Sequence, residues 1–406
     1  MPHVMQSATT PLLLFLGRAK RTFLAGPAAA GAVEPRALVY IGNAAGDLDT
    51  IVSSLTAAFV REQLPAGDLG AASGAPGAPG AAGAPEAALH VPVLPFARAD
   101  FRLRQDASLL FAHCGFEMDG QGAPSELLFW DEVSAELAGA WRDAGLGLVL
   151  TDHNALTPAV GAALGQQVCG IIDHHQDEGK HLDTCDGDAR RIDTSAGSAC
   201  SLVAHEAAAV AACQEDVTLS TLLLATIAAD CRGFDPKQRR FDWADVTAAH
   251  GLLQQLQQQQ VQQLLQQAPD YAADPNAAAA AATAASATRD AVFDMFLKRD
   301  AAAVDSAAAT ARAAALPTAA TVGGAESIGA LGDRLLKARF DVSALSAADL
   351  LKLDYKPASG GGFKVGVAAI FVSLPEFTVL CESSGGLAAT MRAFAEQMGE
   401  AIVVEP

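Results

Sequence analysis

The sequence predicts an α/β protein whose N-terminal domain is built on a mainly parallel sheet. Short apolar runs recur through the first half of the chain, and segments of helical composition separate them. The runs are continuous rather than alternating, which indicates strands buried on both faces, as in a parallel sheet covered by helices. The regular succession of strands and helices favours the same class.

Four apolar runs are expected to be strands, and each of them leads into polar residues: 37–41, 127–130, 146–150 and 168–172. Three intervening segments have helical composition and apolar spacing: 50–63, 134–144 and 198–210. In open sheets of this kind, ligands bind at the carboxyl ends of the strands. The polar residues after the runs are therefore the candidates for chemistry.

Low-complexity segments suggest how the rest of the chain is organised. Residues 70–88 alternate Gly, Ala and Pro and are expected to form a disordered insertion. A Gln-rich and Ala-rich region is expected to be an expanded linker, and a patterned block resumes near Ser327. The expected parts are an N-terminal extension (1–32), a first domain (33–245), a linker (246–326) and a smaller α/β C-terminal domain (327–406).

Composition excludes several classes of protein. The 406 residues carry a formal net charge of −19, which argues against a nucleic-acid or anionic-membrane binder, because such surfaces need clustered Lys and Arg. No stretch of about 18 strongly apolar residues is present to span a bilayer. Seven scattered cysteines without a Cys-x-x-Cys pair favour a reducing, cytoplasmic location. The apolar segment from Pro11 favours a short amphipathic helix packed on the domain, and an organellar transit peptide is the alternative.

Asn43, Asp47 and Asp49 lie in a glycine-punctuated loop between the first predicted strand and the next helix. Their oxygens suit two neighbouring cations, whereas the simpler alternative is that Asp49 caps the helix. Asp152-His153-Asn154 and Asp173-His174-His175 follow two later strands. Hard oxygen ligands with one or two imidazoles favour Mg²⁺ or Mn²⁺ over zinc.

Asp230 ends another apolar run and is a fourth candidate, because a buried carboxylate needs a partner. Its alternative is a surface residue at the end of a helix. The sequence alone favours neither.

This ordered series resembles the four-motif signature of the DHH phosphoesterase superfamily. The Asn after Gly42, where family II pyrophosphatases carry His, resembles the exopolyphosphatase and prune branch. Asp354-Tyr355-Lys356 resembles the motif of the second type of DHH-associated C-terminal domain. The resemblance implies a Rossmann-like DHH domain, a smaller α/β C-terminal domain and an active site in the cleft between them.

The resemblance also implies two divalent ions, Mg²⁺ or Mn²⁺, that activate a water for in-line attack on phosphorus. One ion is expected on Asn43, Asp47 and Asp152, and the other on Asp49, Asp152, His174 and Asp230, with Asp152 as the bridge. Asp152 and His175 are the expected catalytic residues. His153 is expected to contact the metal ligands rather than the metal ions. Substrate phosphate is expected to meet His175, Lys356, Arg191 and Ser198. A solvated Lys356 and a helix cap by Ser198 are the simpler alternatives.

The function implied is a metal-dependent phosphohydrolase acting on phosphoanhydride bonds, most of all an exopolyphosphatase that releases terminal phosphate from inorganic polyphosphate. Another small phosphoanhydride is the alternative partner, and neither nucleic acid nor membrane is expected. Pyrophosphatase or cyclic-nucleotide phosphodiesterase activity is one alternative. An interaction or scaffold protein of the prune type, with weak or no catalysis, is the other.

Overall fold

The computed structural model describes residues 10–405, with gaps at 31–35, 65–87, 186, 235–239, 268–320, 323–325, 361–362 and 399–400. The insertion expected at 70–88 therefore lies outside the described residues except for Ala88. The described residues bury two separate hydrophobic clusters. The larger cluster fills the N-terminal domain, and the smaller one lies mainly within residues 345–394.

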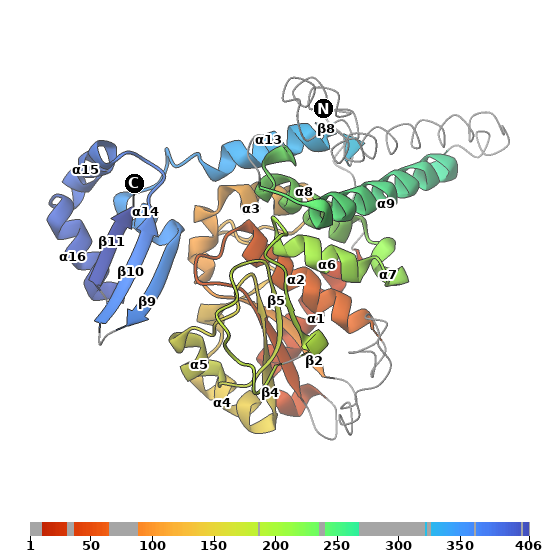
Figure 1. Ribbon diagram of the computed structural model, residues 1–406, viewed down its shortest axis with the longest axis horizontal. Helices are drawn as coiled ribbons and strands as arrows, with labels where there is room; N and C mark the ends of the chain where they lie inside the picture. The colour runs from red at the N-terminus through yellow and green to blue at the C-terminus, as the bar shows by residue number, and fades with distance from the viewer. Residues whose placement is uncertain are drawn as a thin grey trace.

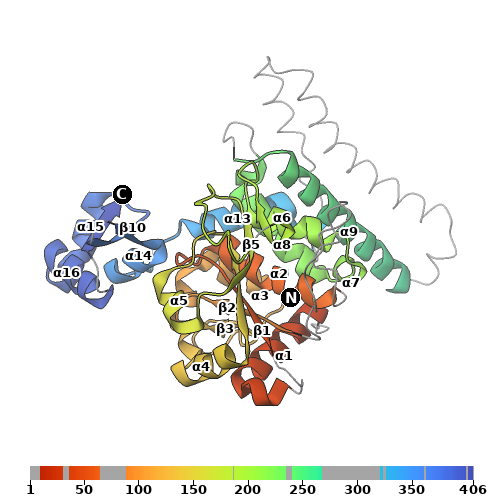
Figure 2. The same cartoon turned by 60° about the horizontal axis from the view of Figure 1, so that its bottom comes forward.

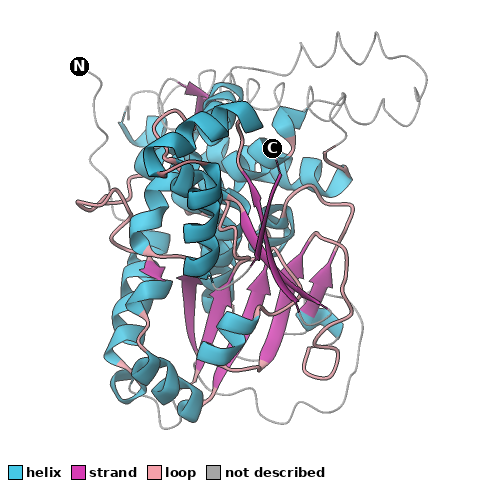
Figure 3. Cartoon of the chain, turned by 90° about the vertical axis from the view of Figure 1, so that its left-hand side faces the viewer, coloured by secondary structure: helices cyan, strands magenta, loops and turns pink. Residues whose placement is uncertain are grey.

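A six-stranded sheet forms the centre of the first domain, and its strand order is β3-β2-β1-β4-β5-β6. All neighbouring strands are parallel. The strands are β1 (Ala37–Ile41), β2 (Leu89–Leu94), β3 (Leu128–Phe129), β4 (Leu146–Thr151), β5 (Val168–Asp173) and β6 (Arg190–Ile192). The predicted fold class and all four predicted strands are confirmed. Figure 3 shows the arrows of this sheet running in one direction.

Helices cover both faces of this sheet, with α4 and α5 on one side and α1, α2 and α6 on the other (Figure 1). The helices of this domain are α1 (Pro11–Ala25), α2 (Leu48–Gln63), α3 (Gln105–His113), α4 (Ala135–Ala144), α5 (Pro158–Leu164), α6 (Ala199–Ala207), α7 (Ala211–Gln214) and α8 (Val217–Asp230). Short 3₁₀ segments are Pro27–Ala30, Arg98–Leu103, Trp130–Glu132, Gly187–Ala189, Arg232–Phe234 and Glu382–Ser384. The three predicted helices are present as α2, α4 and α6.

The N-terminal helix α1 is part of the domain core. Six of its side chains are buried, namely Leu12, Leu13, Phe15, Leu16, Ala19 and Phe23. Phe23 stacks on Trp141 of α4 with ring centroids 5.2 Å apart. Asp216 caps α8 and also accepts a hydrogen bond from the Leu12 backbone N–H at 2.7 Å. The prediction of an amphipathic helix packed on the domain is confirmed.

The region expected to be a linker begins within a long helix. Helix α9 spans Trp243–Gln267, and it lies on the far side of the first domain from the C-terminal domain (Figure 2). Val246, Ala249 and Leu252 are buried, so one face of α9 packs into the first domain because apolar side chains recur there at helical spacing. The first part of the expected linker therefore belongs structurally to the first domain. Residues 268–320 lie outside the described residues.

The C-terminal part contains a three-stranded sheet of order β11-β10-β9, with β10 parallel to β11 and antiparallel to β9. A two-stranded pair precedes it, and helix α13 leads from the first domain toward this sheet (Figure 1). The elements are β7 (Thr321–Val322), β8 (Glu326–Ser327), α13 (Ile328–Arg339), α14 (Ala347–Leu353), β9 (Tyr355–Gly360), β10 (Phe363–Ala369), α15 (Leu374–Cys381), α16 (Leu387–Met398) and β11 (Ala401–Glu405). Among the residues described, no helix is both long and apolar enough to cross a bilayer.

Candidate active site

Asp152 is the centre of the polar cluster at the carboxyl ends of β1, β4 and β5. It directly follows β4, its backbone is left-handed (φ 61°), and its side chain is 2% exposed. One carboxylate oxygen, Oδ2, accepts hydrogen bonds from the Thr50 hydroxyl at 2.6 Å and from Asn43 Nδ2 at 2.8 Å. These donors compensate part of the cost of burying the carboxylate and fix its orientation.

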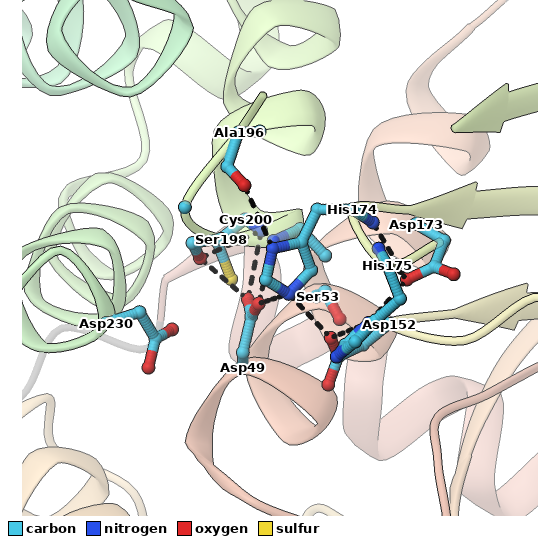
Figure 4. Close-up of polar contacts among 12 residues, drawn as sticks. Asp49, Ser53, Asp152, Asp173, His174, His175, Ala196, Ser198, Cys200 and Asp230 are labelled. Atoms are coloured by element: carbon cyan, nitrogen blue, oxygen red, sulfur yellow. Dashed lines mark hydrogen bonds and ion pairs between the residues drawn. The ribbon is translucent and has the colours of Figure 1, made fainter. Parts of the chain in front are cut away.

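The other oxygen of Asp152, Oδ1, is buried and accepts no hydrogen bond. His174 Nε2 lies 3.2 Å from it and His175 Nδ1 lies 3.6 Å from it. Figure 4 shows both imidazoles beside this carboxylate. Within the described part of the chain, Asp152, His174 and His175 offer ligand atoms that all lie within 4.8 Å of one another. An orphaned buried carboxylate oxygen among imidazoles fits a divalent cation.

Asp49 lies in the first turn of α2 and points to the N-terminus of α6 (Figure 4). Its carboxylate accepts hydrogen bonds from Ser198 Oγ at 2.8 Å, Ala199 N at 2.7 Å and Cys200 N at 3.0 Å. Oδ2 also lies 3.6 Å from His174 Nε2. Burial, reinforced by the negative charge of Asp152, raises the pKa of Asp49 to about 6. A cation bound at this site would favour the ionised carboxylate and lower this pKa again.

Asp173 holds the imidazole of His175. Asp173 is fully buried, and its Oδ1 accepts from the backbone N–H groups of His174 and His175 and from His175 Nδ1 at 2.9 Å. Its Oδ2 accepts from Asn154 Nδ2 at 2.6 Å. Although burial pushes its pKa up, the donors of His175 and Asn154 keep it below the ordinary value. An ionised Asp173 requires the proton on Nδ1, so Nε2 of the half-exposed His175 ring is left for other partners.

Asp47 caps helix α2 by accepting a hydrogen bond from the Thr50 backbone N–H at 3.0 Å. Desolvation acts to raise its pKa, but the charges of Arg339 and Lys356 and the Thr50 N–H together lower it. Asp47 thus stays ionised beside the cluster. The cap that the sequence suggested for Asp49 is formed by Asp47 instead.

Asp230 ends helix α8 and lies apart from the Asp152 cluster (Figure 4). Its Oδ1 accepts a hydrogen bond from Arg339 Nη1 at 3.0 Å, whereas its Oδ2 is buried without a hydrogen-bond partner. Burial raises the pKa of Asp230 to about 7, even though Arg339 acts in the opposite direction. The alternative of a solvated residue at a helix end is wrong, because this side chain is only 13% exposed.

Two residues that were expected to contact phosphate, Arg191 and Ser198, are bound to carboxylates. Arg191 on β6 forms an ion pair with Glu206 of α6 and donates to the Leu202 carbonyl at 3.2 Å. Ser198 is fully buried, caps α6 and donates its hydroxyl to Asp49. Each of these side chains therefore has a carboxylate partner in this structure. His153 is turned inward, with Nδ1 3.0 Å from the Thr151 carbonyl oxygen.

Lys356 lies at the start of β9; its side chain is 62% exposed, and its Nζ lies 3.6 Å from Asp354 Oδ1. A cavity of about 700 Å³ lies between the two domains. Gly42 and Ala44, which flank Asn43, line it from the first domain, and Lys352 and Tyr355 line it from the C-terminal domain. The cavity thus adjoins the loop that carries Asn43.

Several residues that shape the site have no clear sequence signal. Thr50 supplies a hydroxyl to Asp152, and Arg104 donates to the Ala45 carbonyl at 2.6 Å with its guanidinium stacked on Phe96. Arg339 reaches Asp230 from a helix 109 positions further along the chain. The acidic and histidine motifs identify the candidate ligands, whereas these supporting contacts depend on the tertiary fold.

Comparisons with known proteins agree with the motif series. The DHHA2 domain family model matches residues 333–404. Exopolyphosphatase PRUNE1 of Rattus norvegicus is 25% identical over 358 residues, which cover 88% of this chain and 56% of that protein. Exopolyphosphatase PRUNE1 of Homo sapiens is 25% identical over 339 residues, covering 84% of this chain and 53% of that protein. The chain thus spans little more than half the length of these relatives.

One solved structure is also similar, the putative family II inorganic pyrophosphatase of Methanococcus jannaschii. It covers 90% of this chain and 82% of its own chain, with 16% sequence identity and a TM-score of 0.46. The DHHA2 match and the PRUNE1 relatives agree with the ordered motifs around Asp152. The C-terminal part of the chain matches the DHHA2 domain, and most of the chain is similar to the PRUNE1 exopolyphosphatases.

Proposed function

We propose that this chain is a divalent-metal-dependent phosphohydrolase that cleaves phosphoanhydride bonds, and specifically an exopolyphosphatase that releases terminal phosphate from inorganic polyphosphate. The observation that carries the proposal is the Asp152 carboxylate. Thr50 and Asn43 hold one of its oxygens, and the other is buried without a hydrogen-bond donor beside two imidazoles. The names of the PRUNE1 relatives support polyphosphate as the substrate.

Mg²⁺ or Mn²⁺ would be held by the side chains of Asn43, Asp47, Asp49, Asp152, His174 and Asp230, with Asp152 shared between two ions. When bound, such ions supply an activated water and neutralise charge on the phosphoryl oxygens. The buried oxygens of Asp152 and Asp230 that lack hydrogen bonds fit this role. A buried carboxylate oxygen without a donor is costly, and a cation removes that cost.

His175 is suited to handle a proton at its Nε2 atom. Asp173 holds the Nδ1 proton, so a protonated His175 carries its transferable proton on Nε2. About half of the side chain is exposed, so Nε2 can give its proton to the bridging oxygen that leaves with the shortened polyphosphate chain when water attacks the terminal phosphorus. The acid role therefore falls to His175, and Asp173 keeps its tautomer fixed.

A panel of substrates tests the proposal. We expect the full chain to release phosphate from polyphosphates of graded length, and to need Mg²⁺ or Mn²⁺ for this. Pyrophosphate and cyclic nucleotides are measured beside them, each with each metal. Faster turnover of pyrophosphate or of a cyclic nucleotide than of any polyphosphate would overturn the substrate assignment. Absence of turnover on every phosphoanhydride with both metals would favour the scaffold alternative.

Lys356→Ala is expected to weaken substrate binding. The exposed ammonium of Lys356 acts on Asp47 through its charge, so it lies near enough to the cluster to attract a polyanion. We expect the KM for polyphosphate to rise by about tenfold, the size of one charge-assisted hydrogen bond, with a smaller change in kcat. Steady-state kinetics at fixed ionic strength measures both.

Lys337→Ala is the matched control, because Lys337 is an exposed cation on α13. An equal rise in KM for both variants would mean that only the overall charge matters, and would remove Lys356 from the substrate site.

A further inference from the structure

Arg339 ends α13 and inserts its guanidinium between two carboxylates on different helices. Its Nε donates to Asp106 Oδ2 on α3 at 2.8 Å, and its Nη1 donates to Asp230 Oδ1 at the end of α8 at 3.0 Å. The side chains of Arg339, Asp106 and Asp230 are 19%, 6% and 13% exposed. Two nitrogens of one rigid, planar guanidinium thus bind the two carboxylates, which fixes the position of each relative to the other, while the third nitrogen, Nη2, is buried without a hydrogen-bond partner.

Charge in this group is not balanced. One guanidinium faces the two carboxylates of Asp106 and Asp230, so it can neutralise only one of them when both are ionised. Asp230 Oδ2 is buried and accepts no hydrogen bond, which places an uncompensated oxygen on that carboxylate. Asp47 and Asp49 act on Asp230 as further negative charges. A cation is the group that such an arrangement attracts.

We propose that Arg339 is a positioning residue for the metal centre: it holds Asp230 through Oδ1 so that Oδ2 is presented to a divalent cation. This inference rests on the proposed function, in which Asp230 is a metal ligand. Carboxylates that bind metals are commonly oriented by a hydrogen bond from a neighbouring group, and loss of that neighbour weakens metal binding. Arg339 occupies this place for Asp230.

A purely structural ion pair explains the geometry less well. Helix α13 is already anchored by Leu335, which is fully buried in the core of the first domain. Removing two carboxylates and a guanidinium from water costs free energy that their attraction often only offsets. Asp106 alone could neutralise Arg339, so the second bond to Asp230 needs a reason beyond anchoring.

The position of Arg339 also connects the metal centre with the C-terminal domain. The next residue, Phe340, packs against Phe371 with ring centroids 5.7 Å apart, and the Arg232 guanidinium lies 5.2 Å from the centre of the Phe340 ring. The DHHA2 match at 333–404 includes both Arg339 and Phe371. Arg339 thus lies in the region that matches the DHHA2 family model, and it holds Asp230, which belongs to the first domain.

The test is a Mn²⁺ titration of the full-length chain after chelation, with free Mn²⁺ followed by its electron paramagnetic resonance signal. We expect Arg339→Met to raise the dissociation constant of one bound ion by about 10- to 100-fold, the effect of losing a partner of a ligating carboxylate. Arg339→Lys should lose less Mn²⁺ affinity, because an ammonium keeps the positive charge but cannot bind both carboxylates in the fixed geometry of a guanidinium. Lys337→Met, which removes an exposed charge from the same helix, should bind Mn²⁺ like wild type.

Unchanged or tighter Mn²⁺ binding by a folded Arg339→Met chain would overturn the role of Arg339, because it would mean that the guanidinium only competes with the cation. Circular dichroism and thermal unfolding without metal establish folding. Should Arg339→Met fail to fold, Arg339→Lys carries the test, and wild-type affinity in that variant would overturn the role equally. The variant Asp152→Asn distinguishes failure of the role of Arg339 from failure of the proposed metal centre. If Asp152→Asn also leaves Mn²⁺ binding unchanged, the proposed metal centre itself is wrong.

Discussion

Asp152→Asn is expected to lower kcat for phosphate release by more than about 100-fold. Residues that only hydrogen-bond to a metal ligand typically contribute about 10- to 100-fold, and Asp152 is itself the proposed shared ligand. The substitution keeps the size of the side chain. The amide oxygen can still accept from Thr50 and Asn43, while the amide nitrogen replaces the buried oxygen beside His174. That nitrogen carries no negative charge to share between two cations.

The left-handed backbone at position 152 makes Asn the right replacement. Asn tolerates a φ of 61° better than most residues, whereas Asp152→Ala adds a backbone cost of about 1–2 kcal/mol and leaves two buried donors without their acceptor. Phosphate release and the thermal unfolding midpoint are measured together. Asp131→Asn is the matched control, since Asp131 also follows a strand but is exposed and accepts from the Arg98 backbone N–H. Near-normal turnover by Asp152→Asn would remove Asp152 from the metal centre.

Asp173→Asn is expected to lower kcat by about 10²- to 10⁴-fold, the contribution of a correctly protonated general acid or base. With the amide nitrogen toward Asn154, the neutral amide oxygen holds the Nδ1 proton of His175 more weakly than the carboxylate does and no longer stabilises the protonated ring by its charge. Because Asp173 is not a proposed ligand, Mn²⁺ affinity should change far less than kcat. The new amide also faces Asn154 Nδ2, a clash of donors that costs about 1–3 kcal/mol of stability.

The control for this variant is Asp193→Asn, the same change just after the neighbouring strand β6. The Asp193 side chain accepts hydrogen bonds from Ser195, at 2.9 Å from its backbone N–H and 2.6 Å from its hydroxyl, and no hydrogen bond between Asp193 and His175 is found among the described residues. Only the backbone of Asp193 contacts Asp173, and the substitution leaves this contact in place. We expect its kcat to remain within about twofold of wild type, as for most substitutions away from the site. Equal losses in both variants, or a parallel loss of Mn²⁺ affinity in Asp173→Asn, would contradict the proton-handling role of His175.

The sequence predicted four of the six strands of the sheet, β1, β3, β4 and β5, and missed β2 and β6. β1, β4 and β5 are continuous apolar runs because helices cover both of their faces, and this burial is what the pattern detects. β6 consists of Arg190, Arg191 and Ile192 and carries no such run, since it lies at the edge of the sheet. β2 contains Pro92 within its six residues, which weakens a strand prediction.

At the site, the motifs predicted which residues gather, but not how each is used. Asn43, Asp152 and His174 meet because parallel strands end at the same edge of the sheet. Ser198 and Arg191 were expected at the substrate, yet their partners, Asp49 and Glu206, come from other helices. Such choices depend on side-chain directions in the folded chain. Arg339 is the extreme case, since nothing in its neighbourhood along the sequence distinguishes it from a solvated arginine.

The burial of α1 limits where this protein can be cut during maturation. Leu12, Phe15, Leu16 and Phe23 are each no more than 3% exposed, and burying each such side chain contributes about 1.5–3 kcal/mol. Their sum is comparable with the whole stability of a typical domain, about 5–15 kcal/mol. A protease that removed the chain up to Gly26 would therefore unfold the first domain. Any processing that leaves an active protein must cleave before Thr10, whatever basic residues follow it.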